Sequence, residues 1–343
     1  MEMKTNILLI YTGGTIGMVK DYETGALKAF NFEELVNNIP ELNQLDCKIE
    51  GLSFENPIDS SNMNPGYWSD IAGMIEENYN AYDGFVVLHG SDTMSYSASA
   101  LSFMLEHLAK PVIFTGSQLP IGDLRTDAKE NLITSIQIAA LRKRGKPVVQ
   151  EVGLYFEYKL YRANRTTKIN AEHFEAFASL NHPPLVESGV HLKVHHSYLL
   201  KGPAKTKSLQ VHKTMDNNVA VLKMFPGLNK EVLTSVLSIP NLKALVLETY
   251  GAGNAPMDEW FLDGLKNAVK KGLHIINVTQ CSGGAVAMGH YETSEQLKEM
   301  QLVNGKDITT EAAVAKAMYL LGSKVSGKLF KTIFETSLRG EMV

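Results

Sequence analysis

The chain has 343 residues, 44% of them hydrophobic, and its 33 basic and 37 acidic residues give a formal net charge of −4. This length is typical of two domains, each with an ordinary buried core. The balanced charge excludes a general electrostatic attraction to nucleic acid or to an anionic membrane, and it favours a small neutral or zwitterionic substrate. The two cysteines, Cys47 and Cys281, cannot build a disulfide framework, which is compatible with a reducing compartment.

The N-terminal residues predict neither export nor membrane insertion. The apolar stretch 6–11 is too short for the core of a signal peptide, and no small-residue cleavage site follows it. No segment approaches the roughly 20 apolar residues that a membrane-spanning helix needs. We therefore expect a cytoplasmic protein that binds neither a membrane nor nucleic acid.

Strand-like and helix-like segments alternate along the first 140 residues. Asn64 followed by Pro65 is typical of a helix N-cap with proline in the first turn. Buried strands are predicted at 6–11, 84–88 and 111–115, and helices at 65–79, 95–108 and 127–140. This alternation predicts an α/β fold in which helices cover a mostly parallel sheet.

The composition changes between residues 201 and 218, where Gly, Pro and Lys replace the periodic pattern. We predict an N-terminal catalytic domain at 1–200, a linker at 201–218 and a smaller α/β domain at 219–343. In the last of these, strands are expected at 219–224, 244–247 and 274–278, and helices at 230–238 and 258–271.

Two Gly-flanked segments follow predicted strands, and each places a hydroxyl at a strand end, where ligands bind in open α/β sheets. The first segment contains Gly13, Gly14, Thr15 and Gly17. Its glycines leave backbone N–H groups free to face a ligand, so Thr15 is a candidate nucleophile beside oxyanion donors. A phosphate-binding turn or a plain tight turn are the alternatives, although the segment lacks both the GxGxxG spacing and the lysine of a P-loop.

The second segment supplies Ser91 and Asp92 after the strand at 84–88. Asp92 is a candidate partner for an α-ammonium group. On spacing alone, a helix N-cap for the helix that begins near Ser95 is the favoured interpretation of this pair.

Lys168 is the candidate base for a hydroxyl nucleophile, because Ser–Lys pairs are a known variant of the hydroxyl–base arrangement. A solvated surface charge is the common alternative for a lone lysine. The spacing does not establish that Lys168 meets Ser91.

Two other polar segments are candidate ligand cradles. Asp59, Ser60 and Ser61 lie before the Pro65 helix and offer groups for a substrate carboxylate, although turn chemistry alone also explains them. For Thr279–Gly284 we favour a Gly-rich turn between a strand and a helix. His191, His195, His196 and His212 have no Cys or carboxylate cluster beside them, so no metal is predicted.

Taken together, these motifs resemble the bacterial type I, cytoplasmic L-asparaginase family. They are YTGGTIGM at 11–18, DSSNM at 59–63, HGSDTM at 89–94, TGSQLP at 115–120, NRTTK at 164–168, YGAGNAP at 250–256 and TQC at 279–281. The resemblance implies a two-domain asparaginase-like fold with a flavodoxin- or Rossmann-like C-terminal domain. It also implies a homodimer or homotetramer, whose active sites a neighbouring subunit completes, and no cofactor.

The resemblance also assigns roles. Thr15 would form the acyl-enzyme that releases ammonia from L-asparagine, and Ser91, Asp92 and Lys168 would form the second catalytic group. Asp92 would also bind the substrate ammonium. The other substrate-binding positions would be Gly14, Asp59, Ser60, Ser61 and Gly90, the two serines holding the α-carboxylate.

This chain departs from the family pattern at three places. Ser91 stands where threonine is usual, which keeps the hydroxyl but loses the methyl group that limits rotamer freedom. Ala26 aligns with a loop tyrosine that activates the nucleophile, so Tyr22 is the expected substitute. Glu248 replaces an arginine that helps to bind asparagine at an allosteric site, and its opposite charge predicts little cooperativity.

The resulting hypothesis is an L-asparaginase with weaker glutaminase activity. One alternative is an ammonia-supplying amidotransferase subunit, although such subunits usually carry an extra N-terminal domain for which a first strand at residue 6 leaves no room. The other alternative is a non-catalytic amino-acid sensor, which would not need the lysine base.

Overall fold

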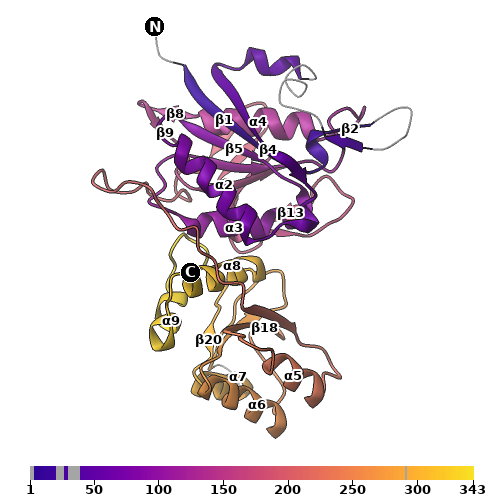
Figure 1. Ribbon diagram of the computed structural model, residues 1–343, viewed down its shortest axis with the longest axis vertical. Helices are drawn as coiled ribbons and strands as arrows, with labels where there is room; N and C mark the ends of the chain where they lie inside the picture. Colours follow the sequence, from indigo (N-terminus) through magenta and orange to yellow (C-terminus); the bar gives the residue numbers. More distant parts are fainter. Residues whose placement is uncertain (1–3, 21–26, 30–38, 290–291) are drawn as a thin grey trace. The chain divides into compact units, whose positions relative to one another are not determined.

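The computed structural model describes residues 4–20, 27–29, 39–289 and 292–343. The chain divides into two compact units, Met1–Lys213 and Thr214–Val343, which are described separately below (Figure 1). This division falls inside the predicted 201–218 linker, while the exact domain bounds stay a prediction. Among the described residues, no helix is both long and apolar enough to cross a membrane.

The first unit is built on a mostly parallel sheet, which has eight strands within the described ranges in the order β15-β14-β11-β10-β7-β5-β1-β4. From β4 through β1, β5 and β7 to β10, neighbouring strands run parallel, whereas β11, β14 and β15 are added antiparallel. The strands are β1 (Thr5–Gly13), β4 (Cys47–Ile58), β5 (Gly84–Leu88), β7 (Val112–Thr115), β10 (Val152–Phe156), β11 (Lys159–Arg162), β14 (Val186–Ser188) and β15 (Leu192–Val194).

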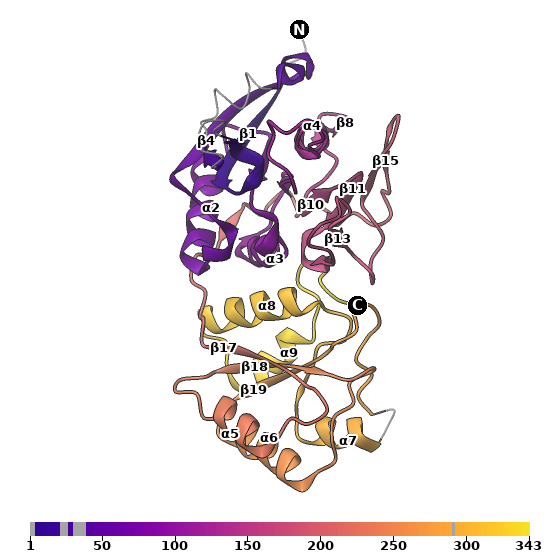
Figure 2. The same cartoon turned by 90° about the vertical axis from the view of Figure 1, so that its right-hand side faces the viewer.

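Helices cover both faces of this sheet, as the alternating pattern predicts. Helix α4 (Ala128–Ala140) packs Leu132 and Ile136 against Ile7 and Leu9 of β1 in one core cluster. Helices α2 (Pro65–Asn78) and α3 (Met94–Met104) lie on the other face (Figure 2). The Asn64 side chain accepts a hydrogen bond from the Gly66 N–H over 2.9 Å, which confirms the predicted N-cap of α2.

Short elements connect these layers and carry the predicted site residues. They are η1 (Thr15–Gly17), β2 (Met18–Lys20), β3 (Leu27–Ala29), η2 (Pro40–Gln44), η3 (Ser60–Asn62), η4 (Ser91–Thr93), β6 (Leu105–Glu106), β8 (Arg142–Lys143), β9 (Lys146–Pro147), η5 (Ala163–Arg165), β12 (Thr167–Lys168), β13 (Phe177–Ala178) and β16 (Gln210–Val211).

The second unit is a parallel α/β sandwich, as expected. Its sheet has the order β17-β18-β19-β20, and all of its paired strands run parallel. The strands are β17 (Val219–Lys223), β18 (Ala244–Thr249), β19 (His274–Thr279) and β20 (Val303–Asn304), and the helices are α5 (Lys230–Leu237), α6 (Glu259–Lys270), α7 (Glu292–Glu299), α8 (Thr310–Gly322) and α9 (Gly327–Phe334).

A buried ion pair holds the last residues of the chain against α8. The side chains of Lys316 and Glu341 are both fully buried, and the Lys316 ammonium donates to the Glu341 carboxylate. It also donates to the carbonyl oxygens of Phe334 and Thr336, each over 2.7 Å. Three hydrogen-bond acceptors therefore offset the cost of removing the Lys316 charge from water.

The predicted helix at 95–108 is too long at its C-terminal end. The helix ends at Met104, because Leu105 and Glu106 pair as β6 with β16, and His107 has a φ of 61°. Among the longer elements, the strands β4, β10, β11, β14, β15 and β20 and the helices α7, α8 and α9 have no counterpart in the segments predicted above.

His89 follows β5 directly and is completely buried. Its Nδ1 donates to the Gly90 carbonyl over 2.7 Å, and no protein atom of the described residues hydrogen-bonds its Nε2. Burial lowers the pKa of His89 to about 4, despite the opposing contact with Gly90. The imidazole is therefore neutral at neutral pH.

This burial predicts a stability that falls in mild acid. Between pH 7 and pH 5 the unfolded chain binds a proton at the ordinary histidine pKa of 6.5, whereas the folded chain does not until about pH 4. The free energy of unfolding should therefore fall by about 2 kcal/mol through this residue. Denaturant unfolding at both pH values should show a smaller fall for His89→Gln than for the parent. The exposed His191→Gln is the matched control, and equal falls in parent and His89→Gln would contradict the prediction.

Candidate active site

Three turns meet at the carboxyl ends of β1, β4 and β5, because these neighbouring strands are parallel. Gly14 has a φ of +86°, and a Cβ atom there would lie 2.4 Å from the Gly90 nitrogen. A Cβ atom on Gly90 would lie 2.5 Å from the Ser60 Oγ. Neither glycine therefore has room for a side chain, and the three turns are in van der Waals contact.

Thr15 begins η1, directly after the contact between Gly14 and Gly90. The Tyr11 hydroxyl donates to the Gly17 carbonyl over 3.0 Å, and Gly17 leaves no room for a Cβ beside the tyrosine ring. Burial raises the pKa of Tyr11 to about 12, so that this hydroxyl stays a donor. The half-buried Thr15 is thus carried on a turn that is fixed at both ends.

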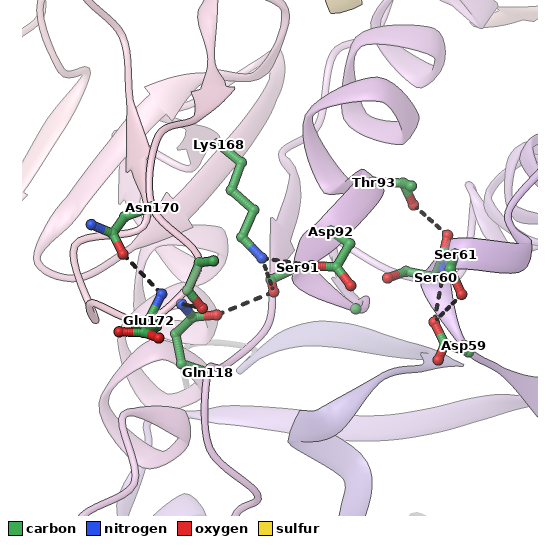
Figure 3. Close-up of polar contacts among 12 residues, drawn as sticks. Asp59, Ser60, Ser61, Ser91, Asp92, Thr93, Gln118, Lys168, Asn170 and Glu172 are labelled. Carbon is green, nitrogen blue, oxygen red and sulfur yellow. Dashed lines mark hydrogen bonds and ion pairs between the residues drawn. The ribbon is translucent and has the colours of Figure 1, made fainter.

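Ser91, Asp92 and Lys168 form one hydrogen-bonded cluster (Figure 3). The Lys168 Nζ donates to the Ser91 Oγ over 2.9 Å and to the Asp92 Oδ1 over 2.7 Å. The Lys168 side chain is only 17% exposed, whereas that of Asp92 is 68% exposed. The solvated-surface interpretation of Lys168 is therefore wrong.

The N-cap interpretation of Ser91 and Asp92 is also wrong. The N-cap of α3 is Thr93, and its side chain makes no capping hydrogen bond. A short 3-10 turn, η4, intervenes between β5 and α3 and directs the Ser91 hydroxyl to Gln118 and Lys168 instead. The Ser91 and Asp92 side chains therefore bond to Gln118 and Lys168, and not to the first N–H groups of α3.

In the turn before α2, Asp59 caps the short helix η3, and Ser60 hydrogen-bonds to η4. The Asp59 Oδ1 accepts hydrogen bonds from the Ser61 N–H and hydroxyl, at 2.8 and 2.7 Å, which hold the pKa of Asp59 below its usual range. Ser60 is buried, and its carbonyl accepts a bond of 2.7 Å from the Thr93 hydroxyl. Turn chemistry thus accounts for Asp59, while Ser60 is built into the junction of the three turns.

Sequence reasoning missed Gln118 as a site residue. The Ser91 hydroxyl donates to its Oε1 over 3.2 Å, and its Nε2 donates to the carbonyls of Ala171 and His173. The only feature of the sequence that could have identified Gln118 was its position within the TGSQLP motif after β7. Tyr22 and Ala26 lie outside the described residues.

In the second unit, polar groups at the end of β19 hydrogen-bond to residues at the ends of the neighbouring strands. The Thr279 hydroxyl donates to the Gly251 carbonyl over 2.6 Å, and the Gln280 amide donates to the carbonyls of Met224 and Glu248. The Glu248 carboxylate accepts a hydrogen bond from the Thr310 hydroxyl over 2.6 Å. These contacts brace the ends of β17, β18 and β19.

Two of the four singled-out histidines contact glutamates. His195 bonds Glu187, and His212 bonds Glu106 over 2.8 Å. Within the described ranges, no group of three or more His, Cys, Asp or Glu side chains could hold a metal ion.

Comparison with known proteins covers both units. Residues 6–199 match the family model described as asparaginase, N-terminal, and residues 218–334 match the glutaminase/asparaginase C-terminal domain. L-asparaginase 1 of Escherichia coli (strain K12) is 40% identical over 340 residues, which cover 99% of this chain and 98% of that protein.

A solved structure and a more distant relative also match nearly the whole chain. The crystal structure of L-asparaginase I from Vibrio cholerae O1 biovar eltor str. N16961 matches with a TM-score of 0.90 and 39% identity, covering 99% of this chain and 100% of that one. A glutamyl-tRNA(Gln) amidotransferase subunit of Pyrococcus abyssi (strain GE5 / Orsay) is 31% identical over 98% of this chain and 76% of its own length. With both family models matched along a chain of this fold, the protein belongs to the asparaginase family.

Proposed function

We propose that the protein is an L-asparagine amidohydrolase that forms aspartate and ammonia through an acyl-enzyme on Thr15, with weaker activity on L-glutamine. The observation that carries this proposal is the Lys168 ammonium, held between Ser91 and Asp92 beside the turn that bears Thr15. A hydroxyl nucleophile, a hydroxyl–lysine pair and free backbone N–H groups are the parts that acyl transfer needs.

The substrate is bound by its two charged groups. Asp92 uses one oxygen for Lys168 and is otherwise open to solvent, so its carboxylate can accept the α-ammonium of asparagine. Ser60 and Ser61 receive the α-carboxylate together with the backbone at Gly14 and Gly90. The Ser61 hydroxyl, which donates to Asp59 in the free protein, rotates to do so.

In the first half-reaction, the Thr15 oxygen attacks the side-chain amide carbon. A C–O bond forms, the C–N bond breaks, and the Thr15 proton leaves with the nitrogen as ammonia. Backbone N–H groups of the Gly-rich turns stabilise the oxyanion, and one such donor typically contributes about 3 kcal/mol. Water then hydrolyses the ester, which releases aspartate and returns the proton to Thr15.

Lys168 and Ser91 transfer the protons in these steps. A lysine acts as a base in its neutral form, and the Lys168 amine accepts the Thr15 proton through the Ser91 hydroxyl, whose Oγ lies 2.9 Å from the Lys168 Nζ. Tyr22 is proposed to assist Thr15 from the preceding loop.

The alternatives have less support. The amidotransferase relative from Pyrococcus abyssi is 31% identical, against 40% for the Escherichia coli asparaginase, and this chain spans 76% of that relative's length. A sensor would not need the Ser91–Lys168 pair. We further propose that the enzyme is cytoplasmic and works without a cofactor as a homodimer or homotetramer, as the family resemblance implies.

The nucleophile is tested by Thr15→Ala. The purified parent should release ammonia rapidly from L-asparagine and more slowly from L-glutamine, and Thr15→Ala should lower turnover of asparagine by about 10³-fold or more. Its thermal unfolding should match that of the parent, as should that of the exposed control Thr206→Ala. Residual turnover within about tenfold of the parent would remove Thr15 from this role. A folded parent that releases no ammonia would refute the function itself.

The base is tested by Lys168→Met, which keeps the length and apolar stem of the side chain but removes the ammonium. We expect kcat to fall by roughly 10³-fold, because the hydroxyl loses its proton acceptor. The exposed Lys201→Met is the matched control and should retain parental kcat. A loss of less than about tenfold in Lys168→Met would mean that the lysine only supports its neighbours.

Glu248 predicts simple saturation kinetics. Its carboxylate is occupied by Thr310 and lies 4.0 Å from the Lys223 ammonium, so it offers an asparagine carboxylate only repulsion. The rate against asparagine concentration should be hyperbolic, with a Hill coefficient of about 1. A clearly sigmoidal curve would show that an allosteric site functions despite Glu248.

A further inference from the structure

Gln118 joins the Ser91–Lys168 pair to the loop that follows Lys168. Its Nε2 donates to the carbonyls of Ala171 and His173 over 3.1 and 3.0 Å. Because a carbonyl only accepts hydrogen bonds, these two contacts determine which end of the amide is the nitrogen. The Oε1 therefore faces Ser91 and accepts its hydroxyl proton over 3.2 Å (Figure 3).

This arrangement assigns both functions of the Ser91 hydroxyl. Its proton goes to Gln118, and a lone pair receives the Lys168 Nζ over 2.9 Å. Serine has no branch at Cβ, so sterics restrict its χ1 less than they restrict that of threonine. At this position the two hydrogen bonds, rather than a methyl group, select the rotamer.

Gln118 can perform this role because its own position is fixed from both sides. Its backbone N–H donates to both carboxylate oxygens of Asp127, at 3.1 and 2.9 Å, and this contact does not depend on the side chain. The carbonyls that it binds lie in a loop capped by the Asn170 Oδ1, which accepts the N–H groups of Glu172 and His173. The contacts thus run from Lys168 through Ser91 and Gln118 back to the loop that Lys168 begins.

We propose that Gln118 is a positioning residue that holds the Ser91 side chain in the χ1 rotamer that keeps its Oγ beside Lys168. When Lys168 is neutral, the Ser91 hydrogen turns from Gln118 to the Lys168 amine without a change of χ1. This inference rests on the proposed function, since Ser91 and Lys168 act in proton transfer there. It predicts a specific dependence: the need for Gln118 should shrink when residue 91 is branched at Cβ, because the branch then restricts χ1 by itself.

The test is a double-mutant cycle between Gln118→Met and Ser91→Thr, read as ammonia release from L-asparagine. Gln118→Met preserves the shape of the side chain and the backbone bonds to Asp127. We expect kcat to fall by about 10- to 100-fold with KM changed less than about threefold, as for a misplaced catalytic group. Adding Ser91→Thr should restore kcat to within about threefold of Ser91→Thr alone.

Two further variants separate positioning from general damage. Gln118→Glu keeps an oxygen for Ser91, but its carboxylate has no N–H to donate to either loop carbonyl, so its kcat should lie between the parent and Gln118→Met. The exposed Gln137→Met is the matched control and should behave as the parent in rate and thermal unfolding. If Gln118→Met unfolds, Gln118→Glu carries the same test with Ser91→Thr.

The outcomes distinguish this inference from the function on which it rests. With an active parent, two results would show that Gln118 does not position Ser91. One is a kcat within twofold of the parent in both Gln118→Met and Gln118→Glu, and the other is a kcat of Gln118→Met that Ser91→Thr does not restore. If the folded parent releases no ammonia, the proposed function fails and this inference with it.

Discussion

The geometry of the candidate active site depends on a steric constraint, the close approach of three turns at one edge of the larger sheet. Gly14 touches Gly90, and Gly90 touches Ser60, without space for a single additional carbon atom. Parallel pairing of β1 with β4 and β5 brings these turns to the same edge, and the absent side chains let the backbones meet. The turn that carries Thr15 and the turn that carries Ser91 are therefore held against each other by the same backbone contact.

The charged side chains Lys168 and Asp92 lie beside these three turns. Lys168 reaches the junction from another part of the fold and is shielded, whereas its partner Asp92 remains open to solvent. In the proposed mechanism, this one carboxylate binds both Lys168 and the substrate ammonium. Gln118 belongs to the same network through Ser91, so the backbone of the loop after Lys168 also determines how that hydroxyl is directed.

Local features were predictable from the sequence, and long-range contacts mostly were not. The Asn64 cap and the strand-end positions of Thr15 and Ser91 follow from neighbouring residues, so the motif pattern identified them. Spacing could not show that Lys168 bonds Ser91, 77 positions away, and it favoured an N-cap because it could not reveal the intervening turn η4. Gln118 escaped notice because its role depends on carbonyl groups of the loop after Lys168, and backbone acceptors leave no signature in a sequence.

The buried pair of Lys316 and Glu341 has a consequence for the end of the chain. Glu341 precedes only two further residues of the sequence, yet its carboxylate neutralises a cation whose side chain is completely buried. Val343 is also held, by the bond of 2.8 Å from its N–H to Asp307. Glu341 and Met342 are buried although the exposed Val343 follows them, and removing residues 341–343 would leave an unneutralised charge inside the protein.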